Sequence, residues 1–383
     1  RSVVVTGVQT CALPISQEEL DCLYEQAKFQ PIIGNLKDEG RQPEWAKPYL
    51  IHKTKAGTNI AFLAYTFPYY ITYAPNGWQV LEPMARLEED LARPEVKDAD
   101  IVVVLSHLGV RYDEQITETY PQVNLVIGSH THHLFEEGKL VNETYLAAAD
   151  RYGYYLGCID LTVENGRLIE CQIEAIPTKS YILDLDKEDE TFIKAMREEG
   201  HRRLAQKKVA NLGRELDFDE TCQLVLQAVC QETDSQLTLL NTGLIMKTLG
   251  PQVTMADLQE ALPHQMRMAR LVVTGQELKE ICQEVFTKAE LLKNQAIKGM
   301  GFRGKTFGEV ITGNFAYKNG NLLYNRRVVD SNEKFSLVLV DQYYFASYFP
   351  TIKEKEVTLL FPDLLRELVA KYLGKNGANW DKI

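Results

Sequence analysis

The segment Val123-Asn124-Leu125-Val126-Ile127-Gly128-Ser129-His130-Thr131-His132-His133 joins an apolar run to a histidine-rich loop. A short aliphatic and β-branched run of this kind is typical of a buried strand. The histidines therefore follow the carboxyl end of that strand, which is where open α/β sheets place their ligand sites. Because His130 and His132 alternate along an extended loop, both imidazoles can point toward one metal pair or toward neighbouring ions.

A second segment of the same form lies upstream. The apolar run Ile101–Leu105 ends in Ser106-His107-Leu108-Gly109, although the chain contains only 7 histidines. Each motif alone could be a capped or core histidine, but two neighbouring strands that both end on histidine favour a metal site. Imidazole binds several transition metals, so the identity of the ion stays open.

The first part of the chain alternates helix and strand signals up to about residue 180. The Asn-Gly step in Glu164-Asn165-Gly166 predicts a hairpin between two alternating runs, residues 155–163 and 167–173. The other elements predicted here are a helix at residues 17–29, a strand at 31–35, a strand at 59–63 and a helix at 83–91.

A charge-rich stretch with helical periodicity, residues 184–210, separates this part from a second α+β domain that begins at about residue 211. In that second domain the spacing predicts a helix at residues 221–232 and strands at 236–240 and 335–340. We expect His201, within the charged helix, to be exposed.

The composition describes a globular chain of two domains, with 383 residues, 45% hydrophobic and 25% charged. The net charge of −11 and the lack of a basic stripe argue against a nucleic-acid polymer as partner. No apolar run is long enough to span a bilayer, so no membrane partner is expected. The 7 cysteines are odd in number and form no Cys-x-x-Cys pair, which indicates reduced thiols in a cytoplasmic protein.

A family resemblance rests on these histidine motifs. Ser106–Gly109 followed by Gly128–His133 resembles the last two metal motifs of the calcineurin-like metallophosphoesterases, in the branch of bifunctional UDP-sugar hydrolases and 5′-nucleotidases. The resemblance covers about residues 17 to 375. Further matches follow in the order of the family: Lys47–Ile51, Asn241-Thr242-Gly243, Leu262-Pro263-His264, Val273–Leu278, and Gly301–Gly304, which resembles a bacterial intracellular subgroup.

The resemblance implies an α/β fold: a partial metallophosphoesterase β-sandwich flanked by helices at residues 17–182, a linker helix at 183–210, and an α+β 5′-nucleotidase substrate-binding domain at 211–383. It also implies metal-dependent hydrolysis of a small-molecule nucleotide or phosphate ester. Two divalent metal ions, chosen among Mn, Zn, Fe, Co and Ni, would activate a water and neutralise the phosphoryl oxygens. His107 and His130 would bind one ion and His132 the other, with His133 outside the ligand set.

The same resemblance suggests substrate-binding residues in the second domain. Asn241 and Gly243 would contact substrate, although Asn-x-Gly is also an ordinary turn. Arg303 would meet a phosphate or cap a helix. Related enzymes carry a phosphate-binding arginine where this chain has Met246, which leaves specificity open. The aromatic candidates for stacking on the base are Phe345, Tyr348 and Phe349, for which a plain core role is the alternative.

Residues 1–16 resemble no part of the family and look like a translated sequencing-library adapter, so we exclude them from the fold. The alternative is a genuine first strand at Val3-Val4-Val5. From Gln17 the chain resembles the segment after the family's Gly-Asn-His-Asp/Glu motif. We therefore expect the Asp-x-His pair, the bridging Asp, the Asn ligand and the catalytic histidine to be missing, and activity to be weak.

Two other functions are compatible with the sequence. One is a non-catalytic nucleotide-binding module, which the missing motifs and Met246 favour. The other is a structural histidine loop combined with a second domain that mediates protein contacts.

Overall fold

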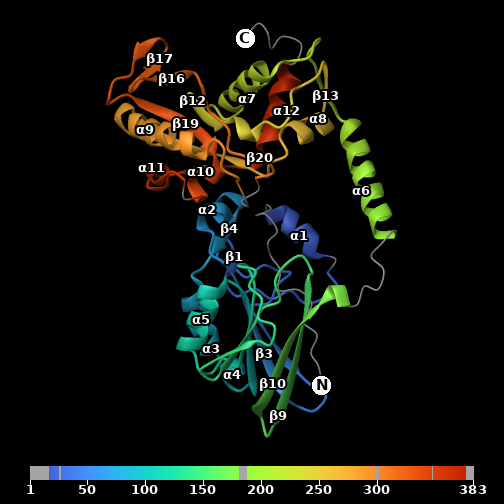
Figure 1. Cartoon of the computed structure of the whole chain (residues 1–383). Helices are drawn as coiled ribbons and strands as arrows, with labels where there is room; N and C mark the ends of the chain where they lie inside the picture. Colours follow the sequence, from blue (N-terminus) through green and yellow to red (C-terminus); the bar gives the residue numbers. More distant parts are fainter. Residues whose placement is uncertain (1–16, 26, 181–187, 298–301, 347, 377–383) are drawn as a thin grey trace. The chain divides into compact units, whose positions relative to one another are not determined.

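The computed structural model describes residues 17–25, 27–180, 188–297, 302–346 and 348–376. The expectations for residues 1–16 and for Gly301 lie outside these ranges. The chain divides into two compact units, Arg1–Asp186 and Lys187–Ile383. Each unit is built around its own sheet (Figure 1).

The first unit contains a six-stranded sheet with the order β2-β3-β5-β6-β8-β7. The four inner strands run parallel and the two edge strands run antiparallel to their neighbours. The strands are β2 (Tyr49–Lys53), β3 (Asn59–Thr66), β5 (Ile101–His107), β6 (Leu125–Gly128), β7 (Lys139–Val141) and β8 (Thr144–Ala147).

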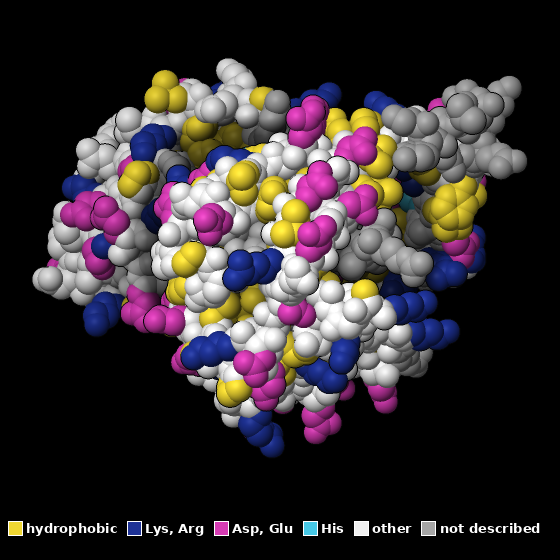
Figure 2. Space-filling model, turned by 90° about the horizontal axis from the view of Figure 1, so that it is seen from below, with side chains coloured by type: hydrophobic (Ala, Val, Ile, Leu, Met, Phe, Trp, Pro, Cys, Tyr) yellow, Lys and Arg dark blue, Asp and Glu magenta, His cyan; other side chains and the backbone are white. Residues whose placement is uncertain are grey.

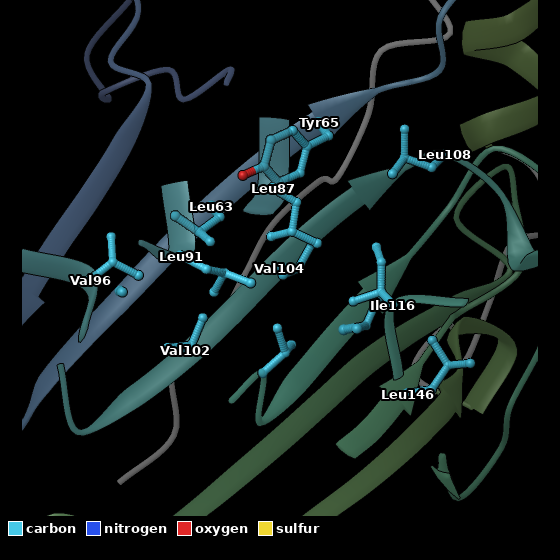
Figure 3. Close-up of a cluster of buried hydrophobic side chains, with 13 residues drawn as sticks. Leu63, Tyr65, Leu87, Leu91, Val96, Val102, Val104, Leu108, Ile116 and Leu146 are labelled. Atoms are coloured by element: carbon cyan, nitrogen blue, oxygen red, sulfur yellow. The ribbon is translucent and has the colours of Figure 1, made fainter. Parts of the chain in front are cut away.

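Helices cover one face of this sheet, namely α3 (Pro83–Leu91), α4 (Pro94–Lys97) and α5 (Val110–Thr119) (Figure 1). Helix α3 begins at a proline, and the Glu82 carboxylate accepts a hydrogen bond from the Ala85 amide. Its buried Leu87 and Leu91 pack with Val102 and Val104 of β5 in one apolar cluster (Figure 3). The helical spacing predicted at residues 83–91 is thus confirmed.

The opposite face of the sheet packs on a hairpin of β9 (Tyr155–Glu164) and β10 (Arg167–Pro177). Ile101 and Val103 point to this side, because successive side chains of a strand alternate between faces. The turn residues Asn165 and Gly166 have φ of 51° and 73°, which the Asn-Gly hairpin turn requires. The predicted hairpin is confirmed, and it gives the first unit its second β-layer.

The strand predicted at residues 31–35 is wrong. Only an isolated bridge joins Ile32 to Lys47, and the chain bends at Gly34 and Asn35 before the short strand β1 (Leu36–Asp38), which pairs with β4 (Trp78–Val80). The reason is the buried Asn35 side chain, whose hydrogen bonds replace the backbone hydrogen bonds that a paired strand would form here. Its amide donates to the Thr66 and Leu81 carbonyls and accepts from the Thr66 N–H.

Helix α1 (Gln17–Glu25) confirms a helix at the start of the described chain, but Phe29 lies beyond its end. A short helix, α2 (Tyr70–Tyr73), and a 3-10 turn, η1 (Ala74–Asn76), follow β3.

On the face in Figure 2, acidic and basic side chains are interspersed with scattered hydrophobic ones. The described residues on that face form no continuous basic stripe of the kind that tracks a nucleic-acid backbone.

The second unit is an α+β fold around a five-stranded sheet with the order β15-β12-β19-β14-β20. Strands β12 and β19 run parallel, and the other neighbours are antiparallel. The strands of this sheet are β12 (Leu237–Asn241), β14 (Arg267–Thr274), β15 (Val310–Gly313), β19 (Lys334–Val340) and β20 (Thr358–Leu364). Two small sheets join β11 (Lys208–Asn211) to β13 (Gln252–Thr254) and β16 (Phe315–Lys318) to β17 (Asn321–Tyr324) and β18 (Arg327–Val328).

Capping boxes start three helices of the second unit, as at Thr274 and Glu277 within the Val273–Leu278 motif. Helices α7 and α12 lie side by side (Figure 1). The helices are α6 (Glu188–Ala205), α7 (Phe218–Glu232), α8 (Met255–Ala261), α9 (Gly275–Leu292), α10 (Asp341–Phe345), α11 (Pro350–Lys353) and α12 (Leu365–Asn376).

Helix α6 occupies most of the predicted charged helix, and its His201 is 60% exposed beside Glu260. In the described ranges, no helix combines the length and the apolar character needed to cross a membrane.

Candidate metal centre

The two histidine-tipped strands are parallel neighbours, as the sequence predicted. Strand β5 ends on His107, β6 ends on Gly128, and Ser106 lies opposite Gly128 in the register. The sheet therefore brings the loop after β6 to the end of β5. This register explains how residues 23 positions apart in the chain meet at one edge of the sheet.

His107 and His130 face each other through ring nitrogens. The distance from His130 Nδ1 to His107 Nε2 is 3.3 Å, and the ring centroids are 5.1 Å apart at 68°. Two nitrogens bound tetrahedrally to one ion at about 2.1 Å lie about 3.4 Å apart. The His130 Nδ1 and His107 Nε2 atoms therefore have the spacing of two ligands of one metal ion.

Both imidazoles are held in the neutral form, which is the form that binds metals. Burial, with smaller contributions from the nearby His130 and His132, lowers the pKa of His107 to about 4. Burial also lowers the pKa of His130, with a smaller contribution from His132. At neutral pH each ring therefore retains a lone pair on one nitrogen.

The other histidines of the loop lie further out. His132 is exposed but close enough to influence the charge of His107 and His130. His133 is also exposed, with its Nδ1 2.9 Å from the Thr131 hydroxyl. Across the described residues, no three or more His, Cys, Asp or Glu side chains are grouped as ligands of one ion. The structure thus brings two of the three predicted ligands into contact and places His132 near them.

The loop that carries these histidines has an unusual backbone. His130 and His132 have φ of 68° and 54°, a region that residues with a side chain rarely adopt. Gly109 also has a positive φ, of 91°, and a Cβ there would lie 2.9 Å from the Thr131 methyl carbon. Left-handed residues persist only when their surroundings hold them, and they cluster at functional sites.

A buried polar pair supports the base of the loop. The Ser106 hydroxyl donates to Asp113 of α5 and accepts from the Leu108 N–H at 3.3 Å. Burial raises the pKa of the Asp113 carboxyl to about 7, against the opposing effect of the Ser106 hydrogen bond. Gly128 packs so closely on Asp113 that a Cβ would lie 2.5 Å from its Oδ2. This packing requires glycine at the end of β6.

The sequence interpretation missed two aromatic residues at this site, Phe67 and Tyr69. Phe67 stacks on His130 with ring centroids 4.9 Å apart and an interplanar angle of 15°. The Tyr69 hydroxyl lies 3.3 Å from His130 Nε2. Both residues follow β3, which pairs in parallel with β5 up to His107. The sequence feature that could have identified them is their position directly after β3, a third parallel strand that ends beside His107.

The substrate candidates of the second unit lie in different environments. Asn241 is fully buried, and its side chain donates to the Phe307 carbonyl at 2.5 Å and accepts from the Tyr343 hydroxyl at 2.7 Å. The Gly243 N–H donates to the same Phe307 carbonyl at 2.9 Å. These contacts hold the turn to the loop around Phe307.

Arg303 is exposed, and its guanidinium donates to Gln265 at 3.2 Å. Its backbone N–H donates to Nδ1 of His264, which is fully buried. Met246, where the resemblance led us to expect an arginine, is 44% exposed. Arg303 is thus anchored through its backbone while its side chain lies at the surface.

The three aromatic candidates differ in exposure. Phe349 is fully buried, with its ring 5.2 Å from that of Tyr343, which corresponds to the core alternative. Phe345 and Tyr348 are half-buried. Phe345 contacts Tyr344 edge to face at 5.3 Å, and Tyr348 contacts Phe307 at 6.4 Å. Of the three, Phe345 and Tyr348 retain surface that a ligand could reach.

Each unit also contains a hollow. In the first unit a cavity of about 380 Å³ lies between the sheet and the hairpin, with Gly128 and Ser129 in its wall. In the second unit a groove of about 550 Å³ is lined by Thr242, Gly308 and the start of α7. The Thr242 side of the predicted substrate turn, rather than Asn241, therefore faces open space.

Comparison with known proteins adds to this geometry. No family model matches the chain. The chain is 32% identical over 379 residues to YunD of Bacillus subtilis (strain 168), described as an uncharacterized metallophosphoesterase, across 94% of this chain and 81% of YunD.

Solved structures resemble the fold of both units. One is a Staphylococcus aureus protein, proposed to be a 5′-nucleotidase, in complex with alpha-ketoglutarate; it has a TM-score of 0.61 and 14% identity, and the match covers 95% of this chain and 79% of that one. Another is the NAD nucleotidase of Haemophilus influenzae, with a TM-score of 0.58 and 13% identity, over 96% of this chain and 80% of that one. The fold class expected from the sequence is confirmed.

Proposed function

Because the chain belongs to the metallophosphoesterase family, we propose that it is a metal-dependent hydrolase of nucleotides or related small phosphate esters. The observation that carries the proposal is the pair of neutral imidazoles, His107 and His130, whose facing nitrogens are 3.3 Å apart. Phosphate esters are anions, and the chain has a net charge of −11, so positive charge must come from the site itself.

In this proposal His107 Nε2 and His130 Nδ1 hold one divalent ion and His132 belongs to a second. Mn, Zn, Fe, Co and Ni all accept imidazole ligands, which leaves the choice of ion open. When bound, such ions supply charge to the phosphoryl oxygens and to an attacking water. The protein residues then have two tasks: to keep both imidazoles neutral and to hold the loop in its left-handed backbone conformation.

We assign the binding of the organic part of the substrate to the second unit. Phe345 and Tyr348 are half-buried rings, Tyr348 contacts Phe307, and Arg303 offers an exposed guanidinium. Asn241 and Gly243 shape the turn through Phe307, and the buried Phe349 contacts the Tyr348 ring, with ring centroids 6.1 Å apart. The six free cysteines among the described residues support a reducing, cytoplasmic location.

We further propose that turnover by this chain is weak. Metal sites of hydrolases combine imidazole with carboxylate ligands to hold two ions together. In the described part of the chain no carboxylate joins His107 and His130 in a ligand group. A non-catalytic module that binds nucleotides is the competing function, because imidazoles and rings alone can bind without hydrolysis.

Phosphatase assays on the purified chain with added Mn²⁺ or Co²⁺ test the proposal. The substrates are AMP, UDP-glucose and bis-p-nitrophenyl phosphate, and the variants are His107→Ala and His130→Ala. His52→Ala is the matched control, because His52 is an exposed histidine on β2 of the same unit. We expect slow, metal-dependent hydrolysis, measured as phosphate from AMP, UMP and glucose 1-phosphate from UDP-glucose, or p-nitrophenol from bis-p-nitrophenyl phosphate, that both site variants abolish and the control retains. Equal turnover in all variants contradicts the site, and nucleotide binding without any turnover establishes the non-catalytic module.

A further inference from the structure

The imidazole of His130 is held on three sides. Its Nδ1 faces His107, its Nε2 lies 3.3 Å from the Tyr69 hydroxyl, and one face of the ring stacks on Phe67 at 4.9 Å. The two ring nitrogens point away from each other, so the Tyr69 contact and the His107 contact lie on opposite edges of the ring. The stacked Phe67 ring and the two contacts at the ring nitrogens together fix the orientation of the His130 imidazole.

The sheet places the segment that provides these contacts. Thr66, the last residue of β3, pairs with His107 in the parallel register, and the Phe67 N–H donates to the His107 carbonyl at 3.0 Å. Phe67 is in turn backed by Tyr112 of α5, with ring centroids 6.0 Å apart and nearly perpendicular. The segment therefore contacts both histidines and is itself fixed by a strand and a helix.

A histidine that binds a metal through one nitrogen usually donates the N–H of the other nitrogen to a fixed acceptor. That hydrogen bond selects the tautomer, and removing the acceptor weakens metal affinity by about 10- to 100-fold. The acceptor is commonly a carboxylate or a carbonyl oxygen. A phenol oxygen can accept in the same way.

Resting on the proposed metal centre, we propose that Tyr69 and Phe67 are positioning residues for His130. The Tyr69 hydroxyl accepts the His130 Nε2–H, and the Phe67 ring fixes the imidazole plane, so that the Nδ1 lone pair points to the position it shares with His107 Nε2. This matters more here than in a relaxed loop, because His130 has a φ of 68° and its backbone does not by itself favour this orientation.

Cobalt binding to the full chain tests the proposal, because Co²⁺ gives visible absorption bands that report ligand geometry without any substrate. We expect Tyr69→Phe, which removes only the hydroxyl of a side chain at 40% exposure, to weaken Co²⁺ affinity about tenfold. Phe67→Leu should weaken the Co²⁺ affinity similarly, whereas Phe67→Tyr, which keeps the stacked ring, should bind Co²⁺ as tightly as the wild-type chain. Tyr70→Phe is the matched control, because Tyr70 is an exposed tyrosine in the next position.

Nuclear magnetic resonance of ¹⁵N-labelled histidine in the metal-free chain gives a second readout. We expect His130 to be the Nε2–H tautomer in the wild-type chain and a mixture of tautomers in Tyr69→Phe, with His130→Gln used to assign the signal. A merely structural tyrosine would leave the tautomer unchanged.

The outcomes separate this inference from the proposed function. Cobalt binding that His107→Ala abolishes, but that Tyr69→Phe and Phe67→Leu leave unchanged, overturns the positioning role and keeps the metal centre. A wild-type chain that binds no cobalt overturns both. If Phe67→Leu fails to fold, Tyr69→Phe and the tautomer signal still decide the question.

Discussion

Replacing Asp113 by asparagine should stabilise the first unit at neutral and alkaline pH. The carboxyl is 3% exposed, and burial raises its pKa from 3.8 to about 7. In the unfolded chain the same group ionises near pH 4. Between these values the folded state binds more protons than the unfolded state, so the free energy of unfolding falls as the pH rises from about 4 to about 7.

The shift of about three pKa units corresponds to about 4 kcal/mol of lost stability above pH 7, at about 1.4 kcal/mol per unit. Asparagine has the shape of the protonated carboxyl and cannot ionise. Its Oδ1 can still accept the hydrogen bond that the Ser106 hydroxyl now donates to Asp113. The variant should therefore match the wild-type stability near pH 4 and exceed it by up to about 4 kcal/mol at pH 8.

Urea denaturation between pH 4.5 and 8 measures this difference, followed by tryptophan fluorescence. The chain has three tryptophans; Trp45 and Trp78 belong to the first unit, and Trp380, which belongs to the second, is replaced by phenylalanine in every variant so that the signal reports the first unit. Glu118→Gln, an exposed carboxylate on the same helix, is the control and should show no pH-dependent gain. An Asp113→Asn variant that is less stable than the wild type at pH 8, or whose advantage shrinks as pH rises, would refute the reasoning.

Two further substitutions test contacts that carry no assigned chemistry. Asn35→Ala should lower the free energy of unfolding of the first unit by about 3 kcal/mol, because it leaves the Thr66 N–H and the Thr66 and Leu81 carbonyls without their buried partner. Urea denaturation measures this loss, and a loss below about 1 kcal/mol would contradict the prediction. His264→Phe should remove a pH dependence from the stability of the second unit. Burial lowers the pKa of His264 to about 4 in the folded state, so as the pH falls the histidine is protonated in the unfolded chain first. The free energy of unfolding of the wild type therefore falls between about pH 6.5 and pH 4. Thermal unfolding between pH 4 and 8 measures that slope, and an identical slope in both proteins would disprove the assignment.

The parts of the fold that were predictable from sequence are those fixed by local chemistry. The runs Ile101–Leu105 and Val123–Ile127 are apolar because both faces of an inner strand are covered, one by helices and one by the hairpin. Asn165-Gly166 specifies its turn through positive φ at both residues. The histidine pair followed from the same logic, because parallel neighbours end at one edge of the sheet.

The parts that sequence could not reveal depend on partners distant in the chain. Asn35 follows an apolar run that reads as a strand, yet its side chain bonds to Thr66 and Leu81, so the backbone bends. The periodicity of residues 341–349 does not separate buried Phe349 from half-buried Phe345 and Tyr348. Only the packing of the second unit makes that distinction.

The site and the stability of the first unit depend on the same few contacts. Gly128 ends β6 against the Asp113 carboxyl, the neighbouring Ser106 hydrogen bonds to that carboxyl, and His107 is the next residue. A change that repels Asp113 from Ser106 would therefore act on the strand end that presents His107 and on the loop that presents His130. Stabilisation by Asp113→Asn is thus expected to leave cobalt affinity unchanged or to raise it, because asparagine keeps this packing without a buried charge. A variant that gains stability but loses cobalt binding would show that the charge of Asp113, rather than its shape, serves the histidine pair.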